Sequence, residues 1–135
     1  MNDKIKKACE YLTTKAYLTY DKKKCGKCAT FVRCAVDFGF DCFIDRTESA
    51  KNYGPSYEKI GFKKVFSYPD IDKKKTDYIE QIGDIAIIDY EPHGHICMRT
   101  SKGWYSDFKQ IDLYGGVIRL EDPKFAIYRY VTNNA

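Results

Sequence analysis

The stretch Gly83-Asp84-Ile85-Ala86-Ile87-Ile88-Asp89-Tyr90 decides the fold class, because the chain changes there from helical to strand-like patterning. Its apolar run is short and rich in β-branched residues, which is typical of a buried strand. A turn at 92–94 follows, and the pattern predicts further strands at about 95–100, 104–108 and 125–131.

Upstream of this stretch, apolar residues recur at helical spacing. Asp3 is placed to cap a first helix, whose apolar positions are Ile5, Ala8, Cys9, Leu12 and Ala16. A second helix is predicted from Cys28 to about Gly39, with Arg33 on its polar face and an apolar stripe of Ala29, Val32, Ala35 and Val36. A short helix is expected at 57–60. Two helices followed by an antiparallel sheet predict an α+β fold in one domain over residues 1–135.

The composition is that of a folded protein with a modest charge. Hydrophobic residues make up 44% and charged residues 31% of the 135 positions, which is typical of a globular chain. The net charge of +4 comes from 23 basic and 19 acidic residues and is scattered, so it does not predict a nucleic-acid partner. Weak attraction to an anionic polymer such as a bacterial wall stays open.

Six cysteines stand at positions 9, 25, 28, 34, 42 and 97. Cys9, Cys34 and Cys97 fall inside regular apolar patterns, as small buried residues do, which argues against a disulfide framework. The N-terminus is not followed by an apolar run, so we expect no signal peptide, and no stretch approaches transmembrane length. We therefore expect a reduced chain that is made in the cytoplasm and does not insert into membranes.

Cys28 is the first candidate for chemistry, because it opens the second predicted helix directly after a glycine-containing loop. Unpaired backbone amides and the helix dipole favour an anion there, so we expect the thiol pKa to fall toward the reactive range. The same amides are placed to hold the oxyanion that forms when a carbonyl is attacked. A cysteine at a helix start is nevertheless more often structural than catalytic.

A base is also needed, and the chain has two histidines. His95 begins a predicted strand, which holds its side chain in one direction, whereas His93 lies in a turn. We choose Asp107 as the group that orients the imidazole. Side chains alternate along strands, so a turn with an odd number of residues near 101–103 places Asp107 on the same face as His95, and an even number does not. This arrangement requires no cofactor and no metal.

Two other interpretations use the same residues. Cys25, Cys28, His93 and His95 together supply four ligands of the kind and number that a tetrahedral zinc site takes. Cys25 and Cys28 also form a C-x-x-C motif of the thioredoxin type, but that motif normally follows a strand in a βαβ unit, which the pattern here does not predict.

Four segments, in the same order, resemble segments of the CHAP and NlpC/P60 amidohydrolases. They are GKCATFVR at 26–33, GP and GF at 54–55 and 61–62, GDIAII with GHICM at 83–88 and 94–98, and WYSDF at 104–108. The first resembles the family's nucleophile segment and the third its pair of strands. The last is similar to the following strand in phage-type wall amidases and type VI secretion amidase effectors.

This resemblance implies a papain-like (NlpC/P60–CHAP) fold, with N-terminal helices packed on an antiparallel sheet. It implies that Cys28 is the nucleophile, His95 the general base and then acid, and Asp107 the third residue, at a position where the family varies. The implied activity is cleavage of an amide bond in the stem peptide of bacterial peptidoglycan, by a delivered antibacterial effector or a phage-type lytic enzyme. Such an enzyme acts on the wall outside the cytoplasm, and a delivered toxin implies a cognate inhibitor (immunity) protein.

Three alternatives stay open at this point. The first is a related cysteine hydrolase that deamidates protein side chains. The second is a zinc-stabilised binding module without catalysis. The third is a domain that has kept the fold without the activity, because a fold does not guarantee a function.

Overall fold

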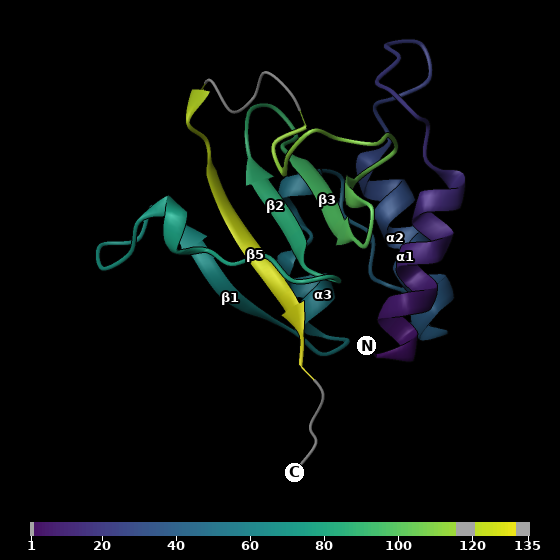
Figure 1. The fold of residues 1–135 in the computed structure, drawn as a ribbon, viewed down its shortest axis with the longest axis horizontal. Coiled ribbons are helices and arrows are strands. Elements are labelled where there is room, and N and C mark those ends of the chain that lie inside the picture. Colours follow the sequence, from purple (N-terminus) through teal and green to yellow (C-terminus); the bar gives the residue numbers. More distant parts are fainter. Residues whose placement is uncertain (1, 116–120, 132–135) are drawn as a thin grey trace.

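The computed structural model describes residues 2–115 and 121–131. Two helices, α1 (Asp3–Lys15) and α2 (Cys28–Phe40), pack side by side against one part of a five-stranded sheet (Figure 1). Between α2 and the sheet the chain forms two short helical segments, η1 (Ala50–Asn52) and α3 (Gly54–Glu58). The short helix expected at 57–60 therefore exists but lies earlier in the chain.

The first helix begins where it was expected, but its cap differs. The side chain of Asn2 accepts hydrogen bonds from the backbone N–H groups of Lys4 (2.9 Å) and Ile5 (3.2 Å). Asn2 is therefore the N-cap, and Asp3 is the first helical residue, where its charge suits the positive end of the helix dipole.

The second helix begins at Cys28, as predicted, but Gly39 does not end it. The helix continues to Phe40 and ends with Asp41 in the left-handed conformation (φ 51°). A Cβ atom at position 39 would lie 2.5 Å from the backbone oxygen of Lys4. Gly39 therefore serves the close approach of α1 and α2.

The faces of α2 follow the predicted stripe with one exception. Val32, Ala35 and Val36 are completely buried, as expected. Arg33 was placed on the polar face, but it is only 8% exposed, and its guanidinium lies 3.5 Å from the Asp37 carboxylate. The long side chain of Arg33 is thus covered, which its sequence position alone did not indicate.

The sheet has the strand order β1-β5-β2-β3-β4, and all its pairs are antiparallel. The strands are β1 (Phe62–Tyr68), β2 (Ile85–Asp89), β3 (His95–Thr100), β4 (Gly103–Tyr105) and β5 (Lys124–Tyr130), and a short helical segment η2 (Lys75–Asp77) follows β1. The α+β class with N-terminal helices on an antiparallel sheet is confirmed.

The sequence pattern missed β1. A register shift between Lys64 and Phe66 interrupts its pairing with β5, so its side chains do not keep the two-residue period that identifies a strand. By contrast, β2 is buried on both faces: Ile85 and Ile87 pack toward the helices, while Ala86 and Ile88 join a second apolar cluster on the other face. That burial explains the continuous apolar run of β2.

The turn between β3 and β4 differs from the odd-numbered loop that we expected. Thr100 pairs with Gly103, so the loop has two residues, and strand alternation alone would turn Asp107 away from His95. However, β4 ends at Tyr105, and the N–H of Ser106 then donates to the backbone oxygen of Phe108 (3.0 Å). Asp107 therefore lies in a tight turn, where strand alternation no longer applies.

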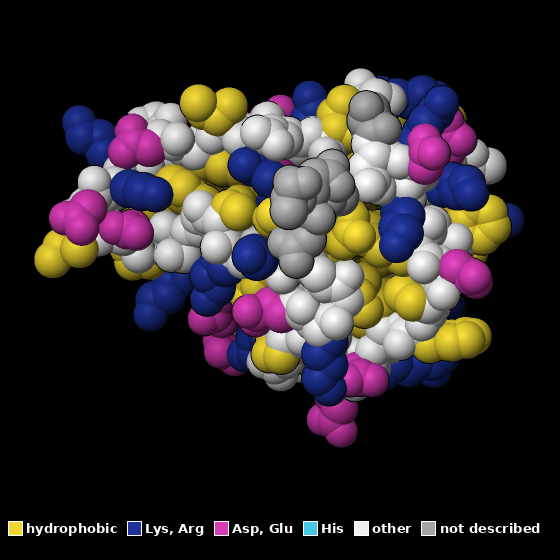
Figure 2. Space-filling model, turned by 90° about the horizontal axis from the view of Figure 1, so that it is seen from below, with side chains coloured by type: hydrophobic (Ala, Val, Ile, Leu, Met, Phe, Trp, Pro, Cys, Tyr) yellow, Lys and Arg dark blue, Asp and Glu magenta, His cyan; other side chains and the backbone are white. Residues whose placement is uncertain are grey.

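Charges of both signs are interspersed on the molecular face seen from below, over the sheet as well as over the helices (Figure 2). None of the helices in the described residues is long and apolar enough to cross a membrane.

Candidate active site

A pocket of about 390 Å³ lies at the N-terminal end of α2. Its lining comes from four parts of the chain: the loop and first turn around Cys28, the segment around Glu48, the start of β3, and the turn at 107–108. In Figure 1 these parts meet near the end of the molecule that carries the loop between α1 and α2. Cys28, His95 and Asp107, which are about 80 residues apart at the extremes, all line this pocket.

The loop before Cys28 is held by a buried carboxylate. Oδ2 of Asp107 accepts hydrogen bonds from the backbone N–H groups of Gly26 (2.7 Å) and Lys27 (2.8 Å), and the Ser106 hydroxyl donates to Oδ1 (3.2 Å). Gly26 has a φ of 111°, which residues with a side chain rarely adopt, so a glycine suits this turn. Asp107 is 2% exposed, and its hydrogen bonds tie the loop before Cys28 to the end of the sheet.

His95 is 9% exposed and stands at the first position of β3, as predicted. Its Nε2 lies 2.7 Å from Oε1 of Gln110. The amide nitrogen of Gln110 donates to the backbone oxygen of Asp112 (2.8 Å), so its oxygen faces the imidazole. Because that oxygen can only accept, we assign the proton of the neutral ring to Nε2, which leaves Nδ1 as a base.

The segment that carries Gln110 packs closely over the imidazole. The Cys97 thiol donates to the backbone oxygen of Leu113 (3.1 Å), which ties this segment to β3. A Cβ atom at Gly115, where φ is 77°, would lie 2.9 Å from Nε2 of His95. The absence of a side chain at this position lets the backbone come close to the ring.

Burial affects the pKa of the Cys28 thiol more than the helix terminus does. Burial raises the pKa of its thiol to about 11; the charge of Asp107 adds to this effect, and backbone amides, above all that of Ile96, oppose it. The expectation that the helix start lowers this pKa is therefore wrong, because desolvation outweighs the amide hydrogen bonds.

The same cause acts on His95 in the opposite direction. Burial lowers the pKa of its imidazole, while the hydrogen bond to Gln110 and the charge of Asp107 partly restore it. A raised thiol pKa beside a lowered imidazole pKa gives a resting pair in which both groups are neutral.

The hydrogen bond to the His95 ring comes from Gln110, and not from Asp107, the residue that we chose for this role. Gln110 makes the hydrogen bond to the imidazole, whereas the carboxylate of Asp107 binds the loop before Cys28. No pattern in the sequence indicated Gln110, because it follows β4 in an irregular segment where side-chain direction has no period. The role of Asp107 as the third residue of a triad stays a prediction.

The remaining candidates lie nearby in other roles. His93 is exposed, and its Nδ1 lies 3.0 Å from the Ser49 hydroxyl oxygen. The sulfur of Cys25 accepts a hydrogen bond from the N–H of Asp21 (3.4 Å), and all six cysteines are free. Within residues 2–115 and 121–131, no group of three or more His, Cys, Asp or Glu side chains is arranged to hold a metal ion, so nothing there favours the zinc interpretation.

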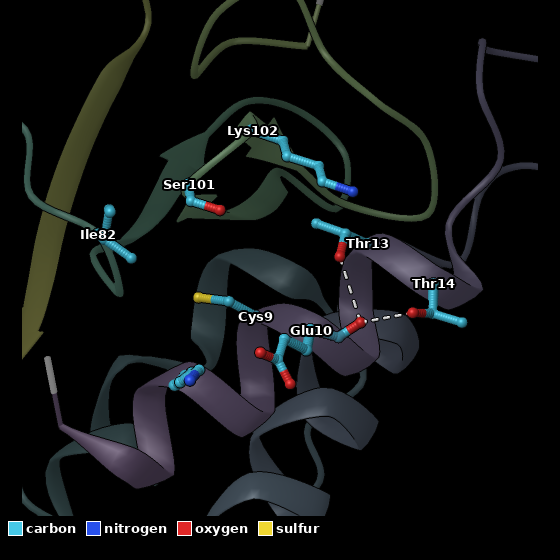
Figure 3. Close-up of a pocket in the computed structure, with 8 residues that line it drawn as sticks. Cys9, Glu10, Thr13, Thr14, Ile82, Ser101 and Lys102 are labelled. Atoms are coloured by element: carbon cyan, nitrogen blue, oxygen red, sulfur yellow. Dashed lines mark hydrogen bonds between the residues drawn. The ribbon is translucent and has the colours of Figure 1, made fainter.

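A second pocket, of about 480 Å³, lies between α1 and the β3–β4 turn (Figure 3). It also contains a cysteine, Cys9, whose pKa burial raises to about 11. No histidine lines it, and the hydroxyls of Thr13 and Thr14 donate to the backbone oxygen of Glu10. It therefore lacks the histidine that the pocket at Cys28 has.

Two crystal structures of the type VI effector–immunity complex Tae3–Tai3 from Ralstonia pickettii resemble this chain. The native complex matches with a TM-score of 0.78 and 30% sequence identity, over 96% of this chain and all of the other. The selenomethionine form matches with a TM-score of 0.71 and 31% identity, over 90% of this chain and 98% of the other. No known family model matches the chain, and no curated protein matches it either.

The helix-borne cysteine, the strand-borne histidine and the antiparallel sheet define an α+β protein of the papain-like fold. At 30% identity over nearly the whole of both chains, the chain belongs to the family of type VI secretion effectors that includes Tae3. The expected resemblance to such effectors is confirmed, while the finer one to CHAP and NlpC/P60 enzymes stays a prediction.

Proposed function

We propose that this protein is a cysteine amidase that cuts an amide bond in the stem peptide of bacterial peptidoglycan, as a delivered antibacterial effector. The observation that carries this proposal is one pocket that holds Cys28 at a helix start together with His95, whose ring is oriented by Gln110. Membership in a family of type VI effectors supports the wall as the target.

The reaction begins from the neutral pair. As the sulfur of Cys28 attacks the amide carbon, its proton moves to Nδ1 of His95, and a carbon–sulfur bond forms. Transfer during attack suits a thiol whose pKa is about 11, because little thiolate exists beforehand at neutral pH. The oxyanion that results lies at the N-terminal end of α2, where backbone N–H groups can stabilise it.

The second half of the reaction reverses the role of the histidine. His95 gives its proton to the departing amine nitrogen, the carbon–nitrogen bond breaks, and a thioester remains on Cys28. Water then attacks the thioester with His95 as base, which releases the acid and restores the thiol. The Gln110 oxygen holds the Nε2–H of the ring throughout, and the negative charge of Asp107 stabilises the imidazolium between the two steps.

The setting of this reaction is part of the proposal. An enzyme made in the cytoplasm reaches peptidoglycan only after export, and type VI delivery supplies that route. The related Tae3 is bound to an immunity protein, Tai3, in both crystal structures. We therefore propose that a cognate immunity protein also binds this chain and blocks its pocket.

The test compares the wild type with Cys28→Ala on purified peptidoglycan, and identifies the released fragments by mass spectrometry. We expect fragments from the wild type only, and their masses identify the amide bond that is cut. Cys34→Ala, on the same helix but outside the pocket, should cut like the wild type. Activity in Cys28→Ala would show that Cys28 is not the nucleophile, and no activity in any protein would favour side-chain deamidation or a binding role.

A further inference from the structure

The active-site pocket has two walls that are built from different parts of the chain. The first wall is the loop before α2, which is tied to the 106–109 turn through Asp107. The backbone of Tyr17 strengthens this tie, because its N–H donates to Asp107 O (2.8 Å) and its oxygen accepts from the N–H of Lys109 (2.8 Å). Lys27 is the lysine of this wall that lines the pocket.

The second wall is the segment around η1, which is tied to the turn before β3. The N–H of Lys51 donates to the backbone oxygen of His93 (3.0 Å), and the Ser49 hydroxyl lies 3.0 Å from the His93 ring nitrogen. Glu48 belongs to this wall, lines the pocket and is exposed. Each wall therefore brings one exposed charged side chain to the space around Cys28, Lys27 from the first wall and Glu48 from the second, while the Asp107 carboxylate of the first wall is buried.

Neither of these two charges has a partner in the part of the chain that the structure describes. In the described residues, the Lys27 ammonium and the Glu48 carboxylate have no ion pair and no side-chain hydrogen bond. Their neighbours behave differently: Lys51 pairs with Glu91 (3.0 Å), and Asp45 pairs with Lys59 (2.6 Å). Lys27 and Glu48 thus remain available to a ligand in the pocket.

We propose that the pocket carries opposite charges on the two sides of Cys28. It thereby selects an amide substrate with a free carboxylate on the Lys27 side and a free ammonium on the Glu48 side. This inference rests on the proposed amidase function and adds the charge pattern of its substrate. A peptide that contains both an acidic residue and a diamino acid has this pattern. Complementary charges at fixed places select orientation and partner more than they add affinity.

The expected effects are moderate, because both side chains are exposed and water screens their charges. Loss of one charge contact should lower kcat/KM by about 3- to 10-fold, as for a partly screened ion pair. The backbone N–H of Lys27 that binds Asp107 is unaffected by a side-chain substitution, so the loop should stay in place.

The test uses four synthetic stem peptides, in which the ammonium is free or acetylated and the carboxylate is free or amidated. We expect Glu48→Gln to lower kcat/KM by about 3- to 10-fold only for peptides with a free ammonium. Lys27→Met should do the same only for peptides with a free carboxylate. Lys22→Met and Glu58→Gln, which change charges outside the pocket, should leave all four rates unchanged.

Three results would overturn the inference. If Glu48→Gln lowers kcat/KM equally for free and acetylated peptides, Glu48 does not recognise the ammonium. Wild-type rates in both variants would show that neither charge selects the substrate, while the amidase function would stand. If the wild type cuts none of the four peptides and no purified peptidoglycan, the amidase function fails and this inference falls with it.

Discussion

Two buried carboxylates, at Asp84 and Asp107, serve different regions of the molecule. Asp84, completely buried just before β2, accepts hydrogen bonds from Nε (2.7 Å) and Nη2 (2.9 Å) of Arg129 and from the Tyr78 hydroxyl (2.7 Å). Asp107, 2% exposed after β4, binds two backbone N–H groups of the loop before Cys28.

Both carboxylates accept from backbone N–H groups, since Asp84 also accepts from the N–H of Gln81 (2.9 Å), but only Asp84 has a cationic partner among the described residues. Asp84 neutralises a specific cation and raises the pKa of Arg129, and these contacts join the start of β2 to β5. Asp107 leaves its charge without a cationic side-chain partner among the described residues, and this charge acts on the pKa values of Cys28 and His95. Both aspartates lie in motifs that resembled wall amidases, but only Asp107 lines the pocket.

The largest effect should come from the histidine that Asp107 influences. His95→Ala should reduce the rate of peptidoglycan cleavage by about 10²- to 10⁴-fold, the range for loss of a general acid–base group. Measurement of initial rates with purified peptidoglycan tests this. Since the substitution leaves the buried Gln110 oxygen without its partner, thermal unfolding should show a stability loss of only about 1–2 kcal/mol. A rate within twofold of the wild type would remove His95 from the mechanism.

Asp84→Ala should show the opposite result, a large loss of stability with the cleavage activity of the folded protein kept. Removal of the carboxylate leaves Arg129 and the Tyr78 hydroxyl without their acceptor, so we expect a stability loss of about 2–4 kcal/mol, reduced from the fully buried case because Arg129 is partly exposed. Urea unfolding measures this loss, and Asp89→Ala, at the exposed end of β2, is the control. The folded fraction of Asp84→Ala should still cut peptidoglycan. An inactive but fully stable variant would contradict the contrast with Asp107.

A comparison of Gln110→Ala with Asp107→Asn separates the two roles near His95. Gln110→Ala should lower kcat by about 10- to 100-fold, because a misoriented imidazole loses the alignment of its proton transfer. Asp107→Asn should cost less, because the asparagine oxygen can still accept from the loop amides. Gln110→Glu keeps an acceptor and should recover much of the rate. If Asp107→Asn is the more damaging change, Asp107 is the third residue of the triad; a wild-type rate would exclude it.

The smallest effect should appear in the pH dependence. Because the pKa of His95 is lowered from 6.5, the base stays neutral in mildly acidic solution, so kcat/KM should fall only below about pH 6.5. Alkylation of Cys28 by iodoacetamide should accelerate continuously from pH 7 to pH 10, since the thiol pKa is about 11. The same alkylation measured on Cys28→Ala gives the contribution of the other cysteines. A rate that is already constant at pH 7 would indicate a thiolate–imidazolium pair at rest.

Local patterns were enough for much of the fold. The helix that begins at Cys28 and the strand that begins at His95 both follow from apolar periodicity, and β2 follows from its β-branched run. Periodicity depends only on neighbouring residues, so these elements can be predicted without the rest of the chain. The register shift at Lys64 breaks this period in β1, and that strand was missed for this reason.

Contacts between distant segments decided the site. Asp107 reaches Gly26 across about 80 residues, and Gln110 reaches His95 from an irregular turn after β4. No local period determines such pairings, because they depend on where the turn at Ser106 directs the chain. Cys28 is likewise partly buried against a core that helices and strands form together, and that burial reversed the expected direction of its pKa. The sequence alone thus placed Cys28 and His95 on their elements, and tertiary packing decided which residues contact them and how they ionise.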